Sequence, residues 1–452
     1  MNNNSHKNYA LIVAIIASFI TPFVGSSINV ALPAIAAEFG INAVLLSWIP
    51  TSYLLALAVF LVPFGRIADI YGRKRIFTYG ITIFTIASFI SIFAFSGPML
   101  IILRIFQGIG SSMIFGNLFA IIASVFPANE RGKALGITIV GVFLGLFLGP
   151  VLGGFLTQYL GWRSIFLFNV PMGIIAIFAV TRLKGEWAEA IGEKFDFIGS
   201  IVLGVSLITI MYGFSILPEI NGFISILGGL IGLSIFVLVE KRIDSPVLNV
   251  NLFKNRSFTS NIIAAFINFS SGISVVFLLS LFLQYVKGFS PQDAGLILAV
   301  QPICMTIFSP FAGNLSDKIE ARKVASVGMG ISAVGFIIFT LITNVTDIWI
   351  VITGLILIGI GFALFSSPNT NAVIGSIEEK YYGVASATLT TMRVMGQMFG
   401  MGITMLVLAI FIGNAAITSG NAKLFLGSMT VSFSIFTILN IAGVFLSLVS
   451  NN

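Results

Sequence analysis

The sequence predicts an all-α integral membrane protein with fourteen membrane-spanning helices, and three observations lead to this fold class. Of the 452 residues 57% are hydrophobic and only 9% are charged, whereas about a quarter of the residues in soluble proteins are charged. Apolar runs of roughly 20 residues, the length that a helix needs to cross a bilayer core, recur along the chain. The runs are too long for the strands of a membrane barrel and lack their alternation.

The predicted spans follow one another with short connections. The first seven are Tyr9–Val30, Leu46–Gly65, Ile76–Phe95, Met99–Phe126, Ala134–Leu156, Ile165–Leu183 and Ile198–Leu217. The other seven are Gly222–Val239, Ser257–Val286, Ala294–Leu315, Val324–Thr343, Ile348–Ile374, Val384–Ile412 and Leu424–Val449. No connection is long enough for a soluble domain, so we expect function to reside in the helices and their turns.

The placement of Lys and Arg predicts the orientation, because cytoplasmic loops are enriched in these residues. Nearly all of the 23 cations fall on one side of the predicted membrane; Arg163, Lys287 and Lys423 fall on the other. Arg104 and Arg393 lie within spans. We therefore expect a multi-pass protein of the cell membrane with both termini in the cytoplasm. The pI near 9.5 then reflects topology, and no nucleic-acid partner is expected.

Residue types needed for catalysis and metal binding are scarce. The one cysteine, Cys304, lies in an apolar run, and the one histidine, His6, precedes the first span. Catalysis would need a nucleophile with a positioned base, or a metal cluster. No G-x-x-x-x-G-K-S/T stretch is present to bind nucleotide phosphates. The sequence therefore predicts neither an enzyme nor an ATP-driven pump, and no cofactor or metal.

A charged turn, GRIADIYGRK, separates the second and third spans. A similar stretch, GNLSDKIEARK, ends the tenth span, so two related halves are predicted, which is the usual build of secondary transporters. Glycine lets the chain reverse, and the acid can pair with arginine or a helix N-terminus. The predicted conformational gate consists of Gly65, Asp69, Gly72, Arg73 and Lys74 with Gly313 and Asp317.

These two turns and the number of spans make the chain resemble the major facilitator superfamily, and within it the fourteen-helix drug:proton antiporter branch. The first turn matches the family pattern G-x-x-x-D-R/K-x-G-R-K/R except at Ile70, where the family has a cation. Three further stretches fit in order: LRIFQGIG from Leu103, GVFLGLFLGPVLGGFL from Gly141 and WRSIFLFNVPMG from Trp162. The resemblance covers essentially the whole chain.

The resemblance implies two six-helix bundles, residues 1–183 and 257–452, with two inserted helices in 184–256. It implies a monomer in the bilayer that moves a small molecule by alternating access, exporting drugs in exchange for protons. Asp69 should then face the thirteenth span near Gly383 and Val384, and Asp317 the fifth near Gly132, closing the cytoplasmic side. The antiporter motif of the fifth span, expected to give a close and bendable contact, comprises Gly141, Gly145, Gly149, Pro150, Gly153 and Gly154.

One departure from the branch concerns charge inside the membrane. The first span reads FVGSSINVALP, with Val24 where the branch usually has an acid, and no Asp or Glu lies at mid-membrane depth. Proton coupling and the binding of lipophilic cations both use membrane-embedded acids. A carrier of a polar or anionic metabolite, with different or no proton coupling, is therefore the alternative function.

The two membrane-embedded arginines allow two interpretations. Arg104 and Arg393 can bond backbone carbonyls and the amides of Gln107 and Gln397, or at least one can face a central cavity and favour an anionic or polar neutral substrate. Polar residues in spans tend to face the bundle interior. The candidates for lining the cavity are Asn29, Tyr53, Gln107, Asn117, Asn268, Gln284, Gln301, Asn369, Asn371 and Gln397.

Overall fold

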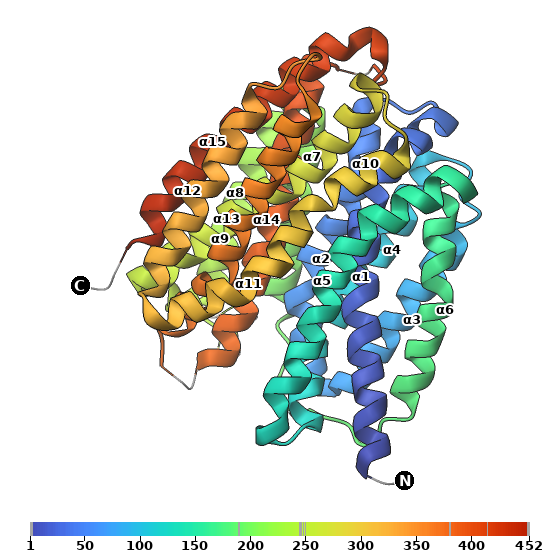
Figure 1. Cartoon of the computed structure of the whole chain (residues 1–452). Helices are drawn as coiled ribbons and strands as arrows, with labels where there is room; N and C mark the ends of the chain where they lie inside the picture. Colours follow the sequence, from blue (N-terminus) through green and yellow to red (C-terminus); the bar gives the residue numbers. More distant parts are fainter. Residues whose placement is uncertain are drawn as a thin grey trace.

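The fold is known from a computed structural model, which describes residues 3–188, 190–243, 246, 248, 250–378, 381–413 and 415–449. Long helices run side by side through the molecule and are joined by short turns (Figure 1). In the described residues thirteen segments are long and apolar enough to cross a membrane. The remaining crossing is the third helix. It falls outside these thirteen because it begins with three cations, Arg73, Lys74 and Arg75. The predicted multi-pass fold with fourteen crossings is confirmed.

The helices form one bundle, an inserted pair and a second bundle. The first bundle consists of α1 (Asn3–Phe39), α2 (Ala43–Tyr71), α3 (Arg73–Ser91), α4 (Gly97–Val125), α5 (Ala128–Leu160) and α6 (Arg163–Thr181). The inserted pair is α7 (Phe197–Ile216) and α8 (Ile220–Glu240). The second bundle consists of α9 (Arg256–Leu281), α10 (Pro291–Leu298), α11 (Val300–Lys318), α12 (Ala321–Thr340), α13 (Ile348–Ile374), α14 (Tyr382–Phe411) and α15 (Ala422–Ser447).

Several boundaries differ from the predicted ones. Helix α1 is 37 residues long and extends beyond the apolar run at both ends. The tenth crossing, Pro291–Lys318, is divided at Ala299 into α10 and α11. A single π-helical turn, Phe282–Val286, ends the ninth crossing. Hydropathy marks the part of a helix that lies in lipid, so it cannot locate ends that continue into water or divisions set by packing.

Glycines bring α5 into close contact with α1. A Cβ at Gly145 would lie 2.5 Å from the carbonyl oxygen of Phe19, and one at Gly153 would lie 2.9 Å from the Cα of Ser27. Gly141 and Gly149 approach α1 in the same way. The fourfold spacing of these glycines therefore forms the smooth face that the sequence predicts, and this face packs inside the first bundle.

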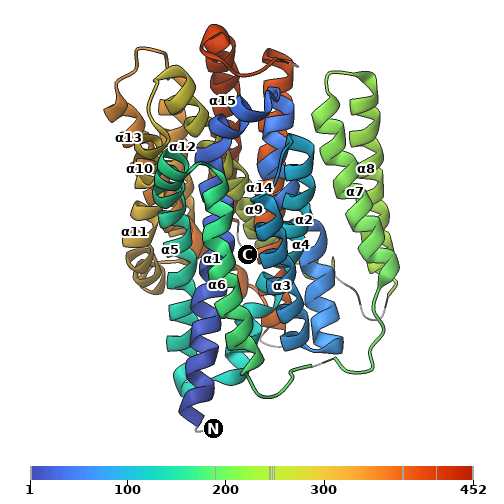
Figure 2. The ribbon, with the colours of Figure 1, turned by 90° about the vertical axis from the view of Figure 1, so that its right-hand side faces the viewer.

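The inserted pair lies at the edge of the molecule (Figure 2). Helix α7 packs against α8, α2 and α14, so it touches both bundles. Gly204 of α7 lies against Val59 of α2, where an added Cβ would be 3.0 Å from Cγ1. Gly402 of α14 lies against Met211 of α7. Most of α8 is exposed and apolar, as expected for a helix that faces lipid.

Candidate functional site

The two bundles are joined on the side of the molecule opposite to the α2–α3 turn. The Ser280 hydroxyl donates to the carbonyl of Asn29 at 2.7 Å, and the Gln284 amide donates to the carbonyl of Val30 at 3.0 Å. The Tyr159 hydroxyl donates to Gln292 at 2.9 Å. We call this the far side, and the side with the α2–α3 turn the basic side. On the far side, backbone and side-chain bonds connect α1 and α5 to the second bundle.

Helix α5 meets α10 at the far side without intervening side chains. The backbone of Gly154 lies against Pro291 and Gln292, and a Cβ there would be 3.1 Å from the Cα of Gln292. Gly295 lies in the same way against the carbonyl of Pro150. The antiporter motif therefore has two faces: four of its glycines pack on α1, while Pro150 and Gly154 meet the other bundle.

On the basic side the ends of α5 and α14 are open. A Cβ added at Gly132, Gly136 or Gly383 would meet no atom within 4 Å. Exposed residues recur along the basic-side half of α5, and at the start of α14 Tyr382 and Val384 are each 40% exposed. Figure 1 shows the basic-side ends of the two bundles apart, with the N-terminus at the lower end. The structure is thus closed on the far side and open on the basic side.

The charged turn of the first bundle is held by its own residues and by the chain that follows α6. Asp69 forms an ion pair with Arg73 at 2.7 Å, one helical turn away. Gly72 has φ of 117°, in the region that favours glycine. A Cβ added at Gly65 would meet no atom within 4 Å. Asp69 does not contact Gly383, whose surroundings are open. The predicted contact between them therefore stays a prediction, for a state that is closed on the basic side.

The corresponding turn of the second bundle is more exposed. Asp317, the next-to-last residue of α11, has an exposed side chain, and a Cβ added at Gly313 would lie 3.5 Å from the Ser367 hydroxyl oxygen. Glu320 bonds Arg322 at 2.8 Å. That hydrogen bond lowers the pKa of the Glu320 carboxyl. The predicted approach of Asp317 to α5 near Gly132 likewise belongs to a state closed on the basic side.

Arg104 is completely enclosed in the first bundle. Its guanidinium lies 4.3 Å from the centre of the Tyr53 ring and donates to Gln107 at 2.9 Å and to the Ile49 carbonyl at 3.3 Å. Gln107 in turn donates to Ser88. The group joins α2, α3 and α4, and this agrees with the packing interpretation of Arg104 and Gln107.

Arg393 is less enclosed, and its environment is different. It donates to the Thr370 hydroxyl at 2.7 Å and the Ser366 carbonyl at 3.1 Å, both on α13. Its guanidinium lies 5.1 Å from the centre of the Phe269 ring on α9. In the described part of the chain, these hydrogen bonds of Arg393 go to neutral oxygens of α13 and not to Gln397. The prediction that the Gln397 amide is the partner of Arg393 was therefore wrong. Arg393 is partly exposed, whereas Arg104 is fully buried.

Most of the candidate cavity residues are buried in this state. The Asn29 and Asn117 amides donate to backbone carbonyls of their own helices. The amide groups of Asn268 and Asn369 are fully buried and have no hydrogen-bond partner among the described residues. Gln301 is also buried, whereas Gln397 and Asn371 are partly or fully exposed. Their role in lining a cavity therefore stays a prediction.

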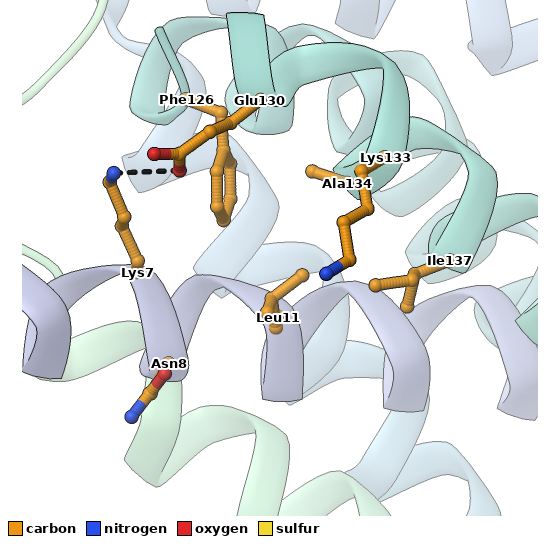
Figure 3. A pocket seen from close by; sticks show the side chains of 8 residues that line it. All are labelled: Lys7, Asn8, Leu11, Phe126, Glu130, Lys133, Ala134 and Ile137. Carbon is orange, nitrogen blue, oxygen red and sulfur yellow. Dashed lines mark hydrogen bonds and ion pairs between the residues drawn. The ribbon is translucent and has the colours of Figure 1, made fainter.

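A small pocket lies where the basic-side ends of α1 and α5 diverge (Figure 3). Its volume is about 250 Å³, and Leu11, Phe126 and Ile137 form much of its apolar wall. Lys7 of α1 pairs with Glu130 of α5 at 2.7 Å across it. Lys133 extends from α5 towards α1. The pair joins two helices of one bundle, so this pocket is separate from the region between the bundles.

Sequence reasoning missed two sets of residues. The far-side contacts of Ser280 and Tyr159 depend on which helices meet, and no local pattern marks them. The sequence predicts only a connection after α6. In the structure this chain binds the α2–α3 turn through Glu186 and Trp187. A signal for it was present, because three cations begin α3 and the first turn of that helix contains no acid.

Comparisons with known proteins agree with this architecture. The family model of the Major Facilitator Superfamily matches residues 14–401 and 261–450. A riboflavin transporter, RibZ, of Clostridioides difficile (strain 630) is 33% identical over 393 residues, covering 86% of this chain and 85% of that protein. Multidrug resistance protein 3 of Bacillus subtilis (strain 168) is 31% identical, covering 79% of this chain and 71% of that protein.

Among solved structures, a bacterial homologue of the human lysosomal transporter Spinster, in an inward-facing and unoccupied conformation, has a similar fold. Its TM-score is 0.72 at 16% sequence identity, with 98% of this chain and 96% of that chain covered. The predicted resemblance is confirmed, as is the prediction of a transporter in place of an enzyme. The chain belongs to the Major Facilitator Superfamily of membrane transporters.

Proposed function

We propose that this transporter works by alternating access and exports drugs or other amphipathic compounds from the cytoplasm in exchange for protons. Relatives named as multidrug resistance or multidrug transporter proteins, 29 to 31% identical to this chain, favour this substrate class. The observation on which the proposal rests most is the closed far side together with the open ends of α5 and α14. If the basic side is cytoplasmic, as its cations suggest, this is the state that receives a substrate for export.

Proton coupling would need a route different from the usual acid of the first span. Val24, at the position of that acid, is fully buried. The two charged turns that form the predicted gate contain the acids Asp69 and Asp317. We propose that any proton linkage acts through these gate carboxylates.

This proposal is tested by reconstituting the protein in proteoliposomes that hold a pH gradient, with one cationic and one anionic amphipathic dye. Coupled antiport predicts that one of the dyes accumulates against its gradient and that collapse of the pH gradient by an ionophore abolishes the accumulation. Equal uptake with and without the gradient would exclude proton coupling, while facilitated equilibration of the dye would still support transport.

The surroundings of Arg393 favour the alternative, a polar or anionic substrate. Its cation lies against an aromatic ring and neutral oxygens, which suits a flat group with acceptor atoms. The riboflavin transporter among the relatives is named for a substrate that has a flat polar ring system. A polar heteroaromatic compound is therefore the second candidate substrate.

Changing Arg393 to Gln tests this alternative. If the guanidinium binds substrate, loss of its charge should weaken transport of an anionic compound about tenfold and of a neutral one much less, because hydrogen bonds to charged groups contribute about 1.5–3 kcal/mol. Arg393→Lys keeps the charge and should retain the preference. The measurement is competition for dye uptake by matched anionic and neutral compounds, and equal loss for both would indicate packing alone.

A further inference from the structure

The chain that follows α6 is bound to the α2–α3 turn along most of its length. We call residues 183–188 and 190–193 the strap. Figure 2 shows this segment passing from α6 below the first bundle to α7. Its bonds to the turn are Lys74 Nζ to the Leu183 carbonyl, Lys74 N to Glu186, Arg73 N to the Trp187 carbonyl, Ala190 N to the Asp69 carbonyl, and the Arg66–Glu193 ion pair.

The N-terminus of α3 explains why the strap is needed. Helix α3 begins with Arg73, Lys74 and Arg75, has no acid in its first turn, and receives no side-chain cap from Gly72. Cations are unfavourable at this positive end of the helix dipole, and its first amides have no partners within the helix. The Glu186 carboxylate accepts from the amide of Lys74 at 2.8 Å and from that of Arg75 at 3.4 Å. Glu186 thus supplies, from a distant part of the sequence, the cap that α3 lacks.

The turn is shaped to receive this carboxylate. A Cβ at Gly72 would lie 2.7 Å from Cγ of Glu186 in its present position, and φ of 117° at Gly72 favours glycine as well. At the other end of the strap Glu193 pairs with Arg66, which lies three residues before Asp69. The strap therefore contacts both sides of the acid that the sequence predicts to be the gate.

The second charged turn has a different arrangement. Helix α12 begins after Glu320, which pairs with Arg322 two residues later, and this turn is held to a distant helix at Ser316, which accepts from the Asn371 amide of α13 at 2.9 Å. The strap also continues into α7, which packs on α2 and on α14. The first turn is therefore connected through the strap to a helix that touches the second bundle, and α14 is the helix whose N-terminus Asp69 is predicted to meet.

We propose that the strap positions the basic-side gate, with Glu186 and Glu193 as its positioning residues. By capping α3 and holding Arg66, they keep the turn in the shape in which Asp69 can meet α14 when the basic side closes. The inference rests on the alternating-access part of the proposed function and is independent of the substrate and of proton coupling.

The test uses the full-length protein with Cys304→Ser and a reporter, Gly383→Cys, at the exposed start of α14. Labelling with a membrane-impermeant maleimide from the basic side should be fast in this form. Labelling should be slow when Gly154→Val is added. That change disfavours closure of the far side, and under alternating access the basic side then closes over position 383. If the strap positions the gate, adding Glu186→Gln should restore labelling about two- to fivefold, because it removes the negative charge from the positive end of the α3 dipole.

Three comparisons make the outcome decisive. Glu219→Gln, the same change at an exposed residue between α7 and α8, should leave the protection unaltered. Arg66→Glu and Glu193→Arg should each restore labelling, and their combination should return protection, which would attribute the effect to the ion pair and not to either residue alone. Continued protection in Glu186→Gln and in both single variants would overturn the role of the strap. If Gly154→Val speeds far-side labelling of Gln292→Cys and yet gives no protection at position 383, the two sides do not alternate, and alternating access and the strap's role both fail.

Discussion

Replacing Asp69 with Asn is expected to reduce transport about tenfold or more while the amount of inserted protein stays the same. Asp69 is 32% exposed and pairs with the nearly buried Arg73 at 2.7 Å. The pair lies among Arg66, Lys74 and Arg75, so the carboxylate is the negative charge within the turn itself. An amide keeps the shape and some hydrogen bonding but removes that charge, and a hydrogen bond to a charged group contributes about 1.5–3 kcal/mol.

The same substitution at Asp347 is the matched control. Asp347 caps α13 through the amide of Trp349 at 3.0 Å, and asparagine caps helices equally well. Initial rates of dye efflux, normalised to the protein in the membrane, should fall for Asp69→Asn and remain normal for Asp347→Asn. Normal efflux by Asp69→Asn would remove Asp69 from the gate. Equal loss of inserted protein in both variants would indicate a general folding effect.

The fold could be predicted from sequence because membrane crossing imposes a composition on every span. A helix in lipid must satisfy its backbone internally and present apolar side chains, so length and hydropathy are sufficient to find it. The exception, α3, shows the limit of this reasoning: its leading cations weaken the signal although it packs between α2, α4 and α6. Cations between spans then gave a consistent orientation.

The site could be predicted only in part, because it depends on contacts between distant segments. The spacing of Gly141, Gly145, Gly149 and Gly153 predicts a smooth helix face, but not that α1 would occupy it. Arg104 and Arg393 look alike in sequence, yet one is enclosed by Tyr53 and Gln107 and the other lies beside Phe269. Glu186 lies more than a hundred residues from the turn that it caps. Each of these facts depends on tertiary packing.

Changing Gly154 to Val is expected to disfavour the state seen here and to abolish most transport. Gly154 allows α5 to touch the backbone of α10 at Pro291, and a Cβ would lie 3.1 Å from the Cα of Gln292. The neighbour is backbone and cannot rotate away, so the added carbons must separate the two helices. Overpacking of this kind costs about 1–3 kcal/mol, which would shift a two-state equilibrium about 5- to 150-fold. The far side should open, and a transporter that cannot close it cannot complete its cycle.

Gly228→Val provides the control, because Gly228 lies on α8 with no atom within 4 Å of an added Cβ. A cysteine introduced at Gln292, in the Cys304→Ser background, should react faster with an impermeant maleimide from the far side when Gly154→Val is present, and at the usual rate with Gly228→Val. Retained efflux with unchanged labelling would mean that the contact accommodates the larger side chain without separating α5 from α10. Lost efflux with unchanged labelling would instead place the role of Gly154 in the fold of α5, because the contact with α10 would then be fixed throughout the cycle.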